Sequence, residues 1–389
     1  MKKIPVTVLS GFLGSGKTTI LNHILKAKKD MYIALIVNDM ASVNIDGKSV
    51  QDKVVETKEK LVQISNGCIC CTLREDLFNE VKKIAEEGKY DYLVIEASGI
   101  SEPLPVAATF TFEMDDGKSL KDVAELDTMV TIVDAHNFIA EYNSAETLKD
   151  RKQEVSPEDE RTVIDLLIDQ LEFANVILVN KADLVSEEDL ATIRKMIRGI
   201  NAHAEIIDTT KSVVELSKIL NTKKFDFEKA QEYPTWIQEI QRDSGHTPET
   251  EEYGISSFVY KKQIPFHPQR LWDFMHKKIP GLVRAKGYFW LPTRMDLAGN
   301  FQLVGRLKEF SVAGQWWAAI PKKEWPDGYK EAIDAEWNEP YGDRRQELVF
   351  IGIDFDKDTI IQDLDACLLT KEELGQNFAT FPDPFPKWE

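Results

Sequence analysis

A stretch of eight residues, GFLGSGKT at positions 11–18, limits the possible folds of this chain more than any other feature. It matches G-x-x-x-x-G-K-[ST], a pattern in which the backbone N–H groups of a glycine-rich turn surround the phosphates of a nucleotide. The pattern has this meaning when a strand precedes it and a helix follows it. Here the apolar stretch IPVTVLS comes before it and the helix-like stretch KTTILNHILKAK comes after it, so the context is the required one.

Each part of this turn has a predicted role. Gly11, Gly14 and Gly16 let the backbone aim its N–H groups at phosphate oxygens, and the helix N-terminus near Gly16 adds a favourable partial charge. Lys17 supplies a positive charge to the β- and γ-phosphates, which makes it a candidate catalytic residue. The Thr18 hydroxyl is a predicted Mg²⁺ ligand.

The first half of the chain alternates between short apolar runs and helix-like segments. Further strands are predicted at YIALIVND, KLVQIS, YDYLVIEASG, TMVTIVDA, NVILVNKAD and AEIIDTT. Helices are predicted at REDLFNEVKKIAEEG, ERTVIDLLIDQLEFA and EEDLATIRKMIRGIN. Apolar strands separated by helices are typical of a mostly parallel sheet covered on both faces, so we expect an α/β fold of the P-loop NTPase class. The charged segment 141–160 is expected to be a solvated insertion.

The pattern changes in the second half. A polar stretch with Pro234, Pro248 and many charges predicts a linker over residues 221–252. Strands are predicted at ISSFVYKK, AKGYFWL, FQLVGRL, QWWAAI and RRQELVFIGID, and helices at HPQRLWDFMHKKI and TIIQDLDACLL. We therefore expect a P-loop domain over residues 1–220 and a smaller α+β domain over residues 253–389, with an antiparallel sheet and helices on one face.

The stretch VNKAD, with Asn180, Lys181 and Asp183, indicates which base is bound. A carboxylate at this strand end can accept hydrogen bonds from N1–H and the exocyclic N2 of guanine. Adenine offers neither donor in that arrangement, so the carboxylate would be left unpaired. The aliphatic stem of Lys181 can lie over the base plane. The motif therefore favours GTP over ATP.

Acidic residues follow two of the predicted strands. Glu96 ends one strand and Asp39 ends another, and ligands of such sheets bind at the carboxyl ends of the strands. Either carboxylate can hold Mg²⁺ through water or orient the attacking water, although Asp39 can also simply cap the next turn. Gly99 allows a backbone N–H to approach the γ-phosphate. Asp134 suits either a site or a strand-end turn.

Three of the four cysteines, Cys68, Cys70 and Cys71, lie within four positions. Such a cluster in a chain without a disulfide framework favours a metal site, and three thiolates can bind Zn²⁺, Cu(I) or Co²⁺ with a further ligand or an open position. The alternatives are a cluster of buried reduced thiols and a redox sensor. The cluster lies between Asp39 and Glu96 in the sequence, so a bound metal can sense the nucleotide. Cys367 is expected to pack in a core.

Charge and hydropathy exclude several classes of protein. The formal net charge of −18 argues against a nucleic-acid binder or an acidic-membrane binder. No apolar run approaches the roughly 18 residues of a membrane span. The N-terminal stretch lacks the cleavage site of a signal peptide. We therefore expect a cytoplasmic protein, in which thiols stay reduced.

Five motifs in this order resemble a known family, the CobW-like P-loop GTPases, which are related to the urease and hydrogenase nickel-insertion GTPases. The motifs are GFLGSGKTT, VNDMASVNIDG, ISNGCICCTLREDL, EASGISEP and VNKADL. The stretches SSFVYKKQIPFHPQRLWDF and RRQELVFIGID are similar to the carboxy-terminal domain of that family, so the resemblance covers nearly the whole chain.

The resemblance implies a GTP-hydrolysing metallochaperone that passes a metal, most often zinc, to a client metalloprotein. It implies Asn180 and Asp183 as guanine ligands, Glu96 as the acidic residue of the E-x-x-G segment, and Cys68, Cys70 and Cys71 as ligands of the transferable metal. It implies as phosphate-binding residues Gly14, Ser15, Gly16, Lys17, Thr18 and Thr19. The chain lacks the His-rich stretch of many family members, which counts against metal storage.

Three alternatives stay open from the sequence. One is a cobalt chaperone for corrinoid synthesis, since cysteine sites for Zn²⁺ and Co²⁺ share ligands. Another is a non-enzymatic metal sensor or buffer in which GTP is structural. The third is a small-molecule kinase, against which Asn180 and Asp183 argue. The client, the fourth metal ligand and the oligomeric state are not set by the sequence.

Overall fold

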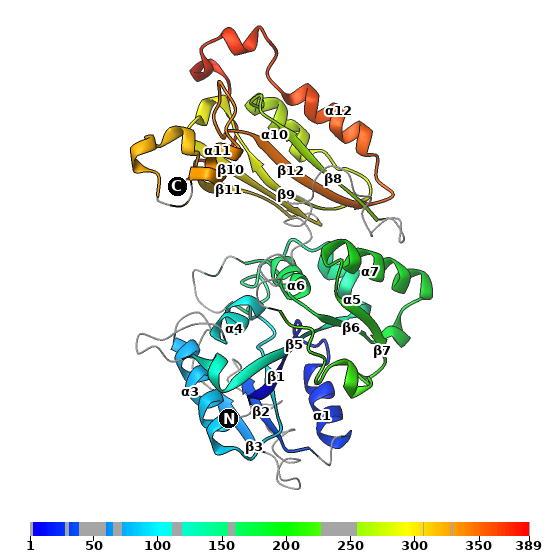
Figure 1. The fold of residues 1–389 in the computed structure, drawn as a ribbon. Coiled ribbons are helices and arrows are strands. Elements are labelled where there is room, and N and C mark those ends of the chain that lie inside the picture. The colour runs from blue at the N-terminus through cyan, green and yellow to red at the C-terminus, as the bar shows by residue number, and fades with distance from the viewer. Residues whose placement is uncertain are drawn as a thin grey trace. The chain divides into compact units, whose positions relative to one another are not determined.

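The computed structural model describes a large part of the chain in two compact units. The units are Met1–Pro234 and Thr235–Glu389, and each is described on its own (Figure 1). The described residues are 3–27, 31–38, 60–64, 72–110, 119–154, 159, 161–226, 255–305, 307–326, 328 and 330–388. No helix among these residues has the length and apolar character that crossing a membrane requires.

The first unit is built on a seven-stranded sheet in the order β3-β2-β4-β1-β5-β6-β7, and every neighbouring pair is parallel. The predicted α/β fold is therefore confirmed. The apolar runs of the sequence form its strands. These strands are apolar on both sides because both faces of the sheet are covered. The strands are β1 (Ile4–Ser10), β2 (Ile33–Asn38), β3 (Lys60–Ile64), β4 (Tyr92–Glu96), β5 (Ala124–Asp134), β6 (Val176–Asn180) and β7 (Glu205–Thr209).

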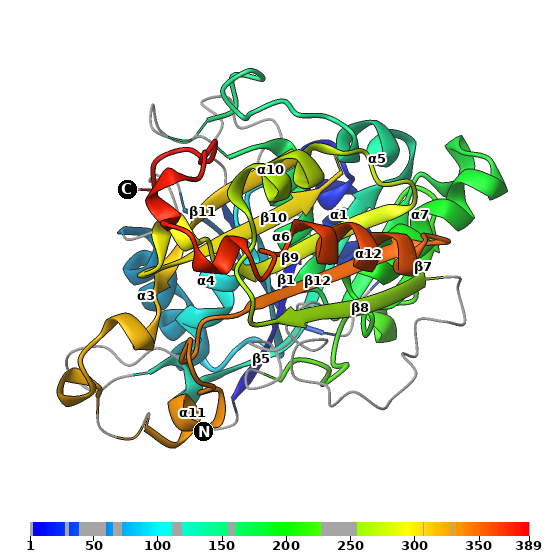
Figure 2. The same cartoon turned by 90° about the horizontal axis from the view of Figure 1, so that it is seen from above.

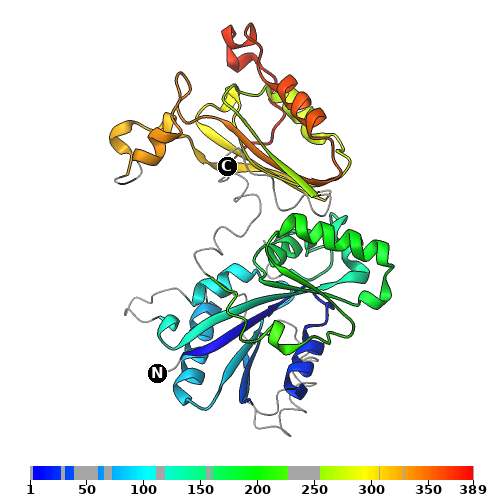
Figure 3. The ribbon, with the colours of Figure 1, turned by 45° about the vertical axis from the view of Figure 1, so that its right-hand side comes forward.

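Helices cover both faces of this sheet. Residues of α3 and α4, such as Phe78 and Val106, pack with Val6 and Val8 of β1 in one core. Residues of α1, such as Leu21, pack in a second core with Leu9 and Val130, and Figure 3 shows α1 in dark blue across the sheet from α3. The helices are α1 (Lys17–Ala27), α3 (Thr72–Glu87), α4 (Pro103–Thr109), α5 (Ala135–Tyr142), α6 (Val163–Glu172) and α7 (Glu187–Ile200).

The charged segment 141–160 is not simply solvated, and that expectation is wrong for part of it. Leu148 is fully buried in a small apolar cluster with Phe12 of the phosphate loop, Ile100 of the loop after β4, and Val163 and Leu166 of α6. A single apolar residue among charges carries no periodic signal, so the sequence could not show this contact.

The second unit contains a five-stranded antiparallel sheet in the order β11-β10-β9-β12-β8, as predicted (Figure 2). Residues of α10 and α12, such as Phe274 and Leu364, share one aromatic-rich core with Phe350 and Phe301 of the sheet. The elements are β8 (Ile255–Lys262), α10 (Pro268–His276), β9 (Leu282–Phe289), β10 (Leu297–Val304), β11 (Leu307–Gln315), α11 (Lys330–Ala335), β12 (Gln346–Ile353) and α12 (Lys357–Cys367).

One predicted strand of this unit is wrong. The stretch QWWAAI is not a strand, because Trp317–Ala319 forms a short 3₁₀ turn. The strand there is the preceding β11, which pairs with β10 in a hairpin and has half-exposed and exposed residues. A half-exposed edge strand such as β11 gives only a weak alternating pattern in the sequence. Aromatic residues are common in strands, so the tryptophan pair favoured the wrong prediction. Trp316 is buried against Trp290 and Ala298.

Cys367 lies at the end of α12 in the aromatic-rich core, where it is 4% exposed. Its Sγ donates to the carbonyl oxygens of Asp363 at 3.1 Å and Arg270 at 3.4 Å. Burial raises the pKa of this thiol to about 12, so it stays protonated. The expected packing role of Cys367 is confirmed.

Candidate nucleotide site

The glycine-rich turn lies between the end of β1 at Ser10 and the start of α1 at Lys17, as the motif predicts. Gly14 and Gly16 have φ angles of +77° and +113°, which side chains with a Cβ rarely adopt. A Cβ on Gly16 would also lie 2.4 Å from the Asn180 amide nitrogen. The turn therefore needs glycine for its conformation and for its close approach to β6.

Lys17 is 9% exposed and reaches back over the turn. Its Nζ donates to the carbonyl oxygens of Gly11 at 2.7 Å and Phe12 at 3.2 Å, so the ammonium group lies within the loop. Thr18 is half-buried and Thr19 is exposed at the start of the helix. The positive charge and the helix N-terminus together favour an anion.

Ser15 supports a ligand at this loop. Its hydroxyl is buried, and it has no hydrogen-bond partner in the part of the chain that the structure describes. A buried hydroxyl without a partner is unfavourable by about 1–3 kcal/mol, so a phosphate oxygen or a metal-bound water would relieve it. The loop residues thus fit the phosphates of a nucleotide, and the Thr18 hydroxyl at the helix start fits a magnesium ion held beside them.

Glu96 is the last residue of β4 and is 5% exposed. It pairs in register with Leu9 of β1 on one side and with Val37 of β2 on the other. The carboxylate therefore lies at the edge of the sheet where the phosphate loop begins. Gly99 follows closely, and a Cβ on it would lie 2.7 Å from Leu13 Cδ2, so the loop after β4 contacts the phosphate loop directly.

Asn180 ends β6 and joins three segments. Its amide nitrogen donates to the Ser15 carbonyl at 2.8 Å. Its amide oxygen accepts from the Ser212 N–H at 2.8 Å and from the Thr209 hydroxyl at 3.2 Å. In this structure the side chain therefore holds the phosphate loop to the turn after β7.

Lys181 and Asp183 follow in the same motif. Lys181 has a φ angle of +61°, and its Nζ lies 2.6 Å from the Asp134 carboxylate. Asp183 is exposed in a short 3₁₀ turn, which leaves its carboxylate accessible to a ligand. Asp134 caps α5 by accepting from the His136 N–H at 3.1 Å, so the strand-end role that the sequence left open for it is confirmed.

The turn after β7 is a part of the site that the sequence reasoning missed. Lys211 and Ser212 have φ angles of +52° and +54°, and Ser212 Oγ donates to the Gly16 carbonyl at 3.2 Å. The signal was present as the polar stretch TTKS directly after an apolar strand. The turns that follow the carboxyl ends of parallel strands all lie at the same edge of the sheet. The stretch TTKS was therefore a candidate part of the nucleotide site.

The predicted metal ligands Cys68, Cys70 and Cys71, and Asp39, lie outside the described residues. The described residues on either side of the cysteines are the end of β3 at Ile64 and the start of α3 at Thr72. Within the residues that are described, no group of three His, Cys, Asp or Glu side chains is arranged to hold a metal ion.

The chain is similar to known proteins over most of its length. Residues 5–208 match the CobW/HypB/UreG nucleotide-binding domain, and residues 255–368 match the cobalamin synthesis protein cobW C-terminal domain. The chain is 49% identical to zinc-regulated GTPase metalloprotein activator 1 of Dictyostelium discoideum, over 96% of this chain and 81% of that protein.

Two bacterial relatives are more distant. The zinc chaperone YjiA of Escherichia coli is 26% identical, over 92% of this chain and 97% of that protein. The zinc chaperone CobW of Pseudomonas aeruginosa is 31% identical, over 57% of this chain and 60% of that protein.

Proposed function

The chain belongs to the CobW/HypB/UreG family of nucleotide-binding proteins and is a GTPase, and on this premise we propose that it is a zinc metallochaperone. It binds the metal at Cys68, Cys70 and Cys71 and delivers it to a client metalloprotein. Its metal affinity depends on whether GTP or GDP is bound.

One observation carries this proposal, namely the register of the strands around β2. Val37 of β2 pairs with Glu96 of β4, and the next residue, Asn38, pairs with Ile64, the last residue of β3. Neighbouring strands lie about 4.8 Å apart, so the end of β3 lies roughly 10 Å from the end of β4 along the same edge. The chain leaves β3 at Ile64 only four positions before Cys68, which supports a thiol site that nucleotide-contacting segments can influence.

The proposed nucleotide chemistry divides among residues of the sheet edge. Lys17 neutralises charge on the β- and γ-phosphates, while Glu96, together with Asp39, orients the water that attacks the γ-phosphate. A magnesium ion held by Thr18 supplies further positive charge to the phosphates when it is bound.

The guanine base is read by the turns after β6 and β7. Asp183 accepts from the N1–H and N2 groups of guanine, and the stem of Lys181 lies over the base. Asn180 contributes by keeping the phosphate loop against the turn at Ser212, as its three hydrogen bonds indicate.

Zinc is the proposed cargo because soft thiolates suit it and because relatives named for zinc match most of this chain. Loss of the γ-phosphate changes the contacts of the segments around the thiols, which lowers metal affinity and lets the ion pass to the client. Cobalt is the competing cargo.

The test is metal analysis of the full chain combined with GTP turnover in the presence of Zn²⁺ or Co²⁺. We expect one Zn²⁺ per chain, and we expect turnover to respond to Zn²⁺ more than to Co²⁺. Replacing Cys70 by Ser should abolish that response, whereas Cys367→Ser, which alters a buried core thiol, should keep it. Turnover that ignores metal would support a nucleotide-binding buffer instead, and a response to Co²⁺ alone would support a cobalt chaperone.

A further inference from the structure

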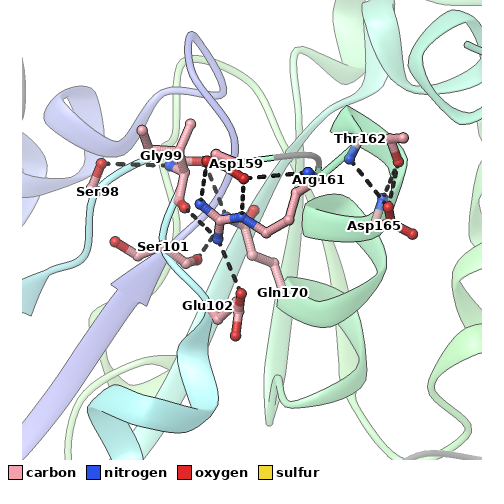
Figure 4. Close-up of polar contacts among 10 residues, drawn as sticks. Ser98, Gly99, Ser101, Glu102, Asp159, Arg161, Thr162, Asp165 and Gln170 are labelled. Atoms are coloured by element: carbon pink, nitrogen blue, oxygen red, sulfur yellow. Dashed lines mark hydrogen bonds and ion pairs between the residues drawn. The ribbon is translucent and has the colours of Figure 1, made fainter. Parts of the chain in front are cut away.

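The loop after β4, residues 98–102, is held by two side chains from the region of α6, and Figure 4 shows both of them pointing at it. Three consecutive peptide groups of this loop are bonded. The Ile100 N–H donates to Ser98 Oγ at 3.5 Å, and the Ser101 N–H donates to the Ser98 carbonyl at 3.0 Å. The carbonyl oxygens of residues 99, 100 and 101 each accept from one of the two side chains described next.

Gln170 of α6 binds two of these carbonyl oxygens. Its Nε2 donates to Gly99 O at 3.2 Å and to Ser101 O at 3.3 Å, and the side chain is fully buried. The two carbonyl acceptors fix the orientation of the amide, because its oxygen would repel them. Its Oε1 has no hydrogen-bond partner among the described residues, so the buried amide leaves one acceptor unsatisfied.

Arg161 binds the middle of the loop from just before α6. One Nη1 group donates to Ile100 O at 3.4 Å and to Glu102 Oε1 at 3.0 Å. The rest of the guanidinium is fixed by Asp159, whose two carboxylate oxygens accept from Nε at 2.8 Å and Nη2 at 2.9 Å. This bidentate pair raises the pKa of Arg161 further above its ordinary value, so the side chain stays a cation.

The backbone that carries Arg161 is itself held. Thr162 caps α6 in a reciprocal pair with Asp165, in which each side chain accepts from the backbone N–H of the other at 3.2 Å. The Leu148 N–H donates to the Arg161 carbonyl at 2.9 Å, and Leu148 packs on Phe12 of the phosphate loop. The backbone that carries the Arg161 side chain is therefore held in place by hydrogen bonds and packing, which fixes the direction of the side chain.

One donor of the loop remains available. The Gly99 N–H donates no hydrogen bond to any residue in the described part of the chain, while the peptide groups that follow it are all bonded. A Cβ on Gly99 would lie 2.7 Å from Leu13 Cδ2 and 3.0 Å from Leu13 N, so Gly99 lies directly beside the phosphate loop.

We propose that Arg161 and Gln170 are positioning residues for the terminal phosphate of GTP, because they fix the loop 98–102 so that the Gly99 N–H can donate to it. This inference rests on the proposed function. Neither side chain touches the nucleotide in this account; both act through the backbone of the loop. We call the hold of Arg161 and Gln170 on the loop 98–102 the clamp. GDP has no γ-phosphate, so GDP binding does not depend on the clamp.

The chain offers a matched control for each residue. Gln346 of the second unit is also fully buried, and its Nε2 also donates to two carbonyl oxygens, Ile264 O at 3.0 Å and Trp290 O at 3.2 Å. Arg270 also binds a carboxylate and a backbone carbonyl, those of Glu373 and Leu368.

The test compares Gln170→Leu with Gln346→Leu, and Arg161→Met with Arg270→Met, in the full chain. The dissociation constants of a non-hydrolysable GTP analogue and of GDP are measured for each variant, together with kcat for GTP. For Gln170→Leu and Arg161→Met we expect the affinity for the analogue relative to GDP to fall about tenfold, the value of one well-placed hydrogen bond. We expect kcat to fall roughly 10- to 100-fold, because the misplaced loop no longer holds the γ-phosphate. Arg161→Lys should recover part of the loss.

The control variants should keep the wild-type affinity ratio and kcat. If Gln170→Leu does not fold, the partly exposed Arg161 series decides the question by the same ratio. If Arg161→Met keeps the wild-type kcat and the wild-type ratio of analogue affinity to GDP affinity, this inference is overturned. The proposed function stays intact in that case as long as the wild type hydrolyses GTP. A wild type that shows no GTP hydrolysis overturns both.

Discussion

Gln170 in the first unit and Gln346 in the second show how the two parts of the molecule use buried polar groups differently. Both side chains are fully buried, and both donate to two backbone carbonyl oxygens. Gln346 Oε1 also accepts from the Trp290 N–H at 3.0 Å, whereas Gln170 Oε1 has no partner among the described residues. Native cores rarely leave such a group unsatisfied, and exceptions gather at functional sites.

The same contrast holds for the wider surroundings of each glutamine. The sheet edge of the first unit buries the polar side chains of Ser15, Lys17, Glu96 and Asn180. The core of the second unit is filled by aromatic rings such as Phe258 and Phe350, which stack with centroids 5.1 Å apart. The two regions therefore differ in what they bury: polar side chains beside the glycine-rich turn in the first, and mainly aromatic rings in this core of the second.

The most severe test of this contrast is Lys17→Ala. Removing the only side-chain cation within the described phosphate loop should lower GTP turnover by roughly 10³-fold, because charge developing on the phosphates loses its stabilisation. The thermal unfolding temperature should change little, and metal binding should persist if the metal and nucleotide sites are separate. Steady-state kinetics, calorimetry and metal titration give the three values. Retained turnover would show that Lys17 has no catalytic role.

In the second unit the corresponding change is Phe350→Ala. Phe350 is 1% exposed, and its removal should destabilise this unit by about 3–5 kcal/mol through lost burial and the cavity left behind. GTP affinity should remain at the wild-type value under conditions in which the variant is folded. Denaturant unfolding and nucleotide titration measure the two effects. A parallel loss of GTP affinity would remove the functional contrast between the units.

A smaller effect is expected for Asp183→Asn. The variant should bind GTP roughly 10- to 100-fold more weakly, since a charged acceptor of two hydrogen bonds is replaced by an amide that matches guanine poorly. Xanthine nucleotides, which carry an oxygen in place of N2, should bind the variant better than the wild type. Competition titrations with GTP, XTP and ATP provide the measurement. An unchanged order of affinities would place base recognition elsewhere.

The smallest effect concerns the surface pair Arg270–Glu373. Hydrogen bonds from Arg270 lower the pKa of Glu373 to about 2, below the value of about 4.3 for an unfolded chain. Its contribution is therefore present above about pH 4.3 and is lost as the pH falls toward 2. At neutral pH Glu373→Gln should cost less than about 1 kcal/mol, because solvent screens this partly exposed pair. Unfolding curves of variant and wild type should converge at acid pH; a constant difference would contradict the assignment.

The sequence predicted the first unit well because its elements have strong local signals. The strands β1, β4 and β6 are mostly apolar and are buried along nearly their whole length, and the glycine-rich turn has one structural meaning in its context. The edge strand β11 and the buried Leu148 were missed, since partial exposure and single apolar residues leave no period to detect.

The candidate site was only partly predictable. Lys17 and Glu96 are where their motifs indicated, at the carboxyl edge of the sheet. The tie from Asn180 to Ser212 and the clamp by Arg161 and Gln170 depend on contacts between segments far apart in the chain. A residue that acts by holding another segment has no motif of its own, so only the fold reveals it.

Coupling between the nucleotide and the thiols is tested by the Zn²⁺ affinity of the full chain, measured once with Mg²⁺ and a non-hydrolysable GTP analogue and once with GDP. If the γ-phosphate and the thiol segment are coupled, the two dissociation constants should differ by at least about fivefold, the lower end of ordinary coupling between sites. Cys367→Ser should leave that difference unchanged. Equal zinc affinities in the two nucleotide states would show that the nucleotide and the metal are not coupled.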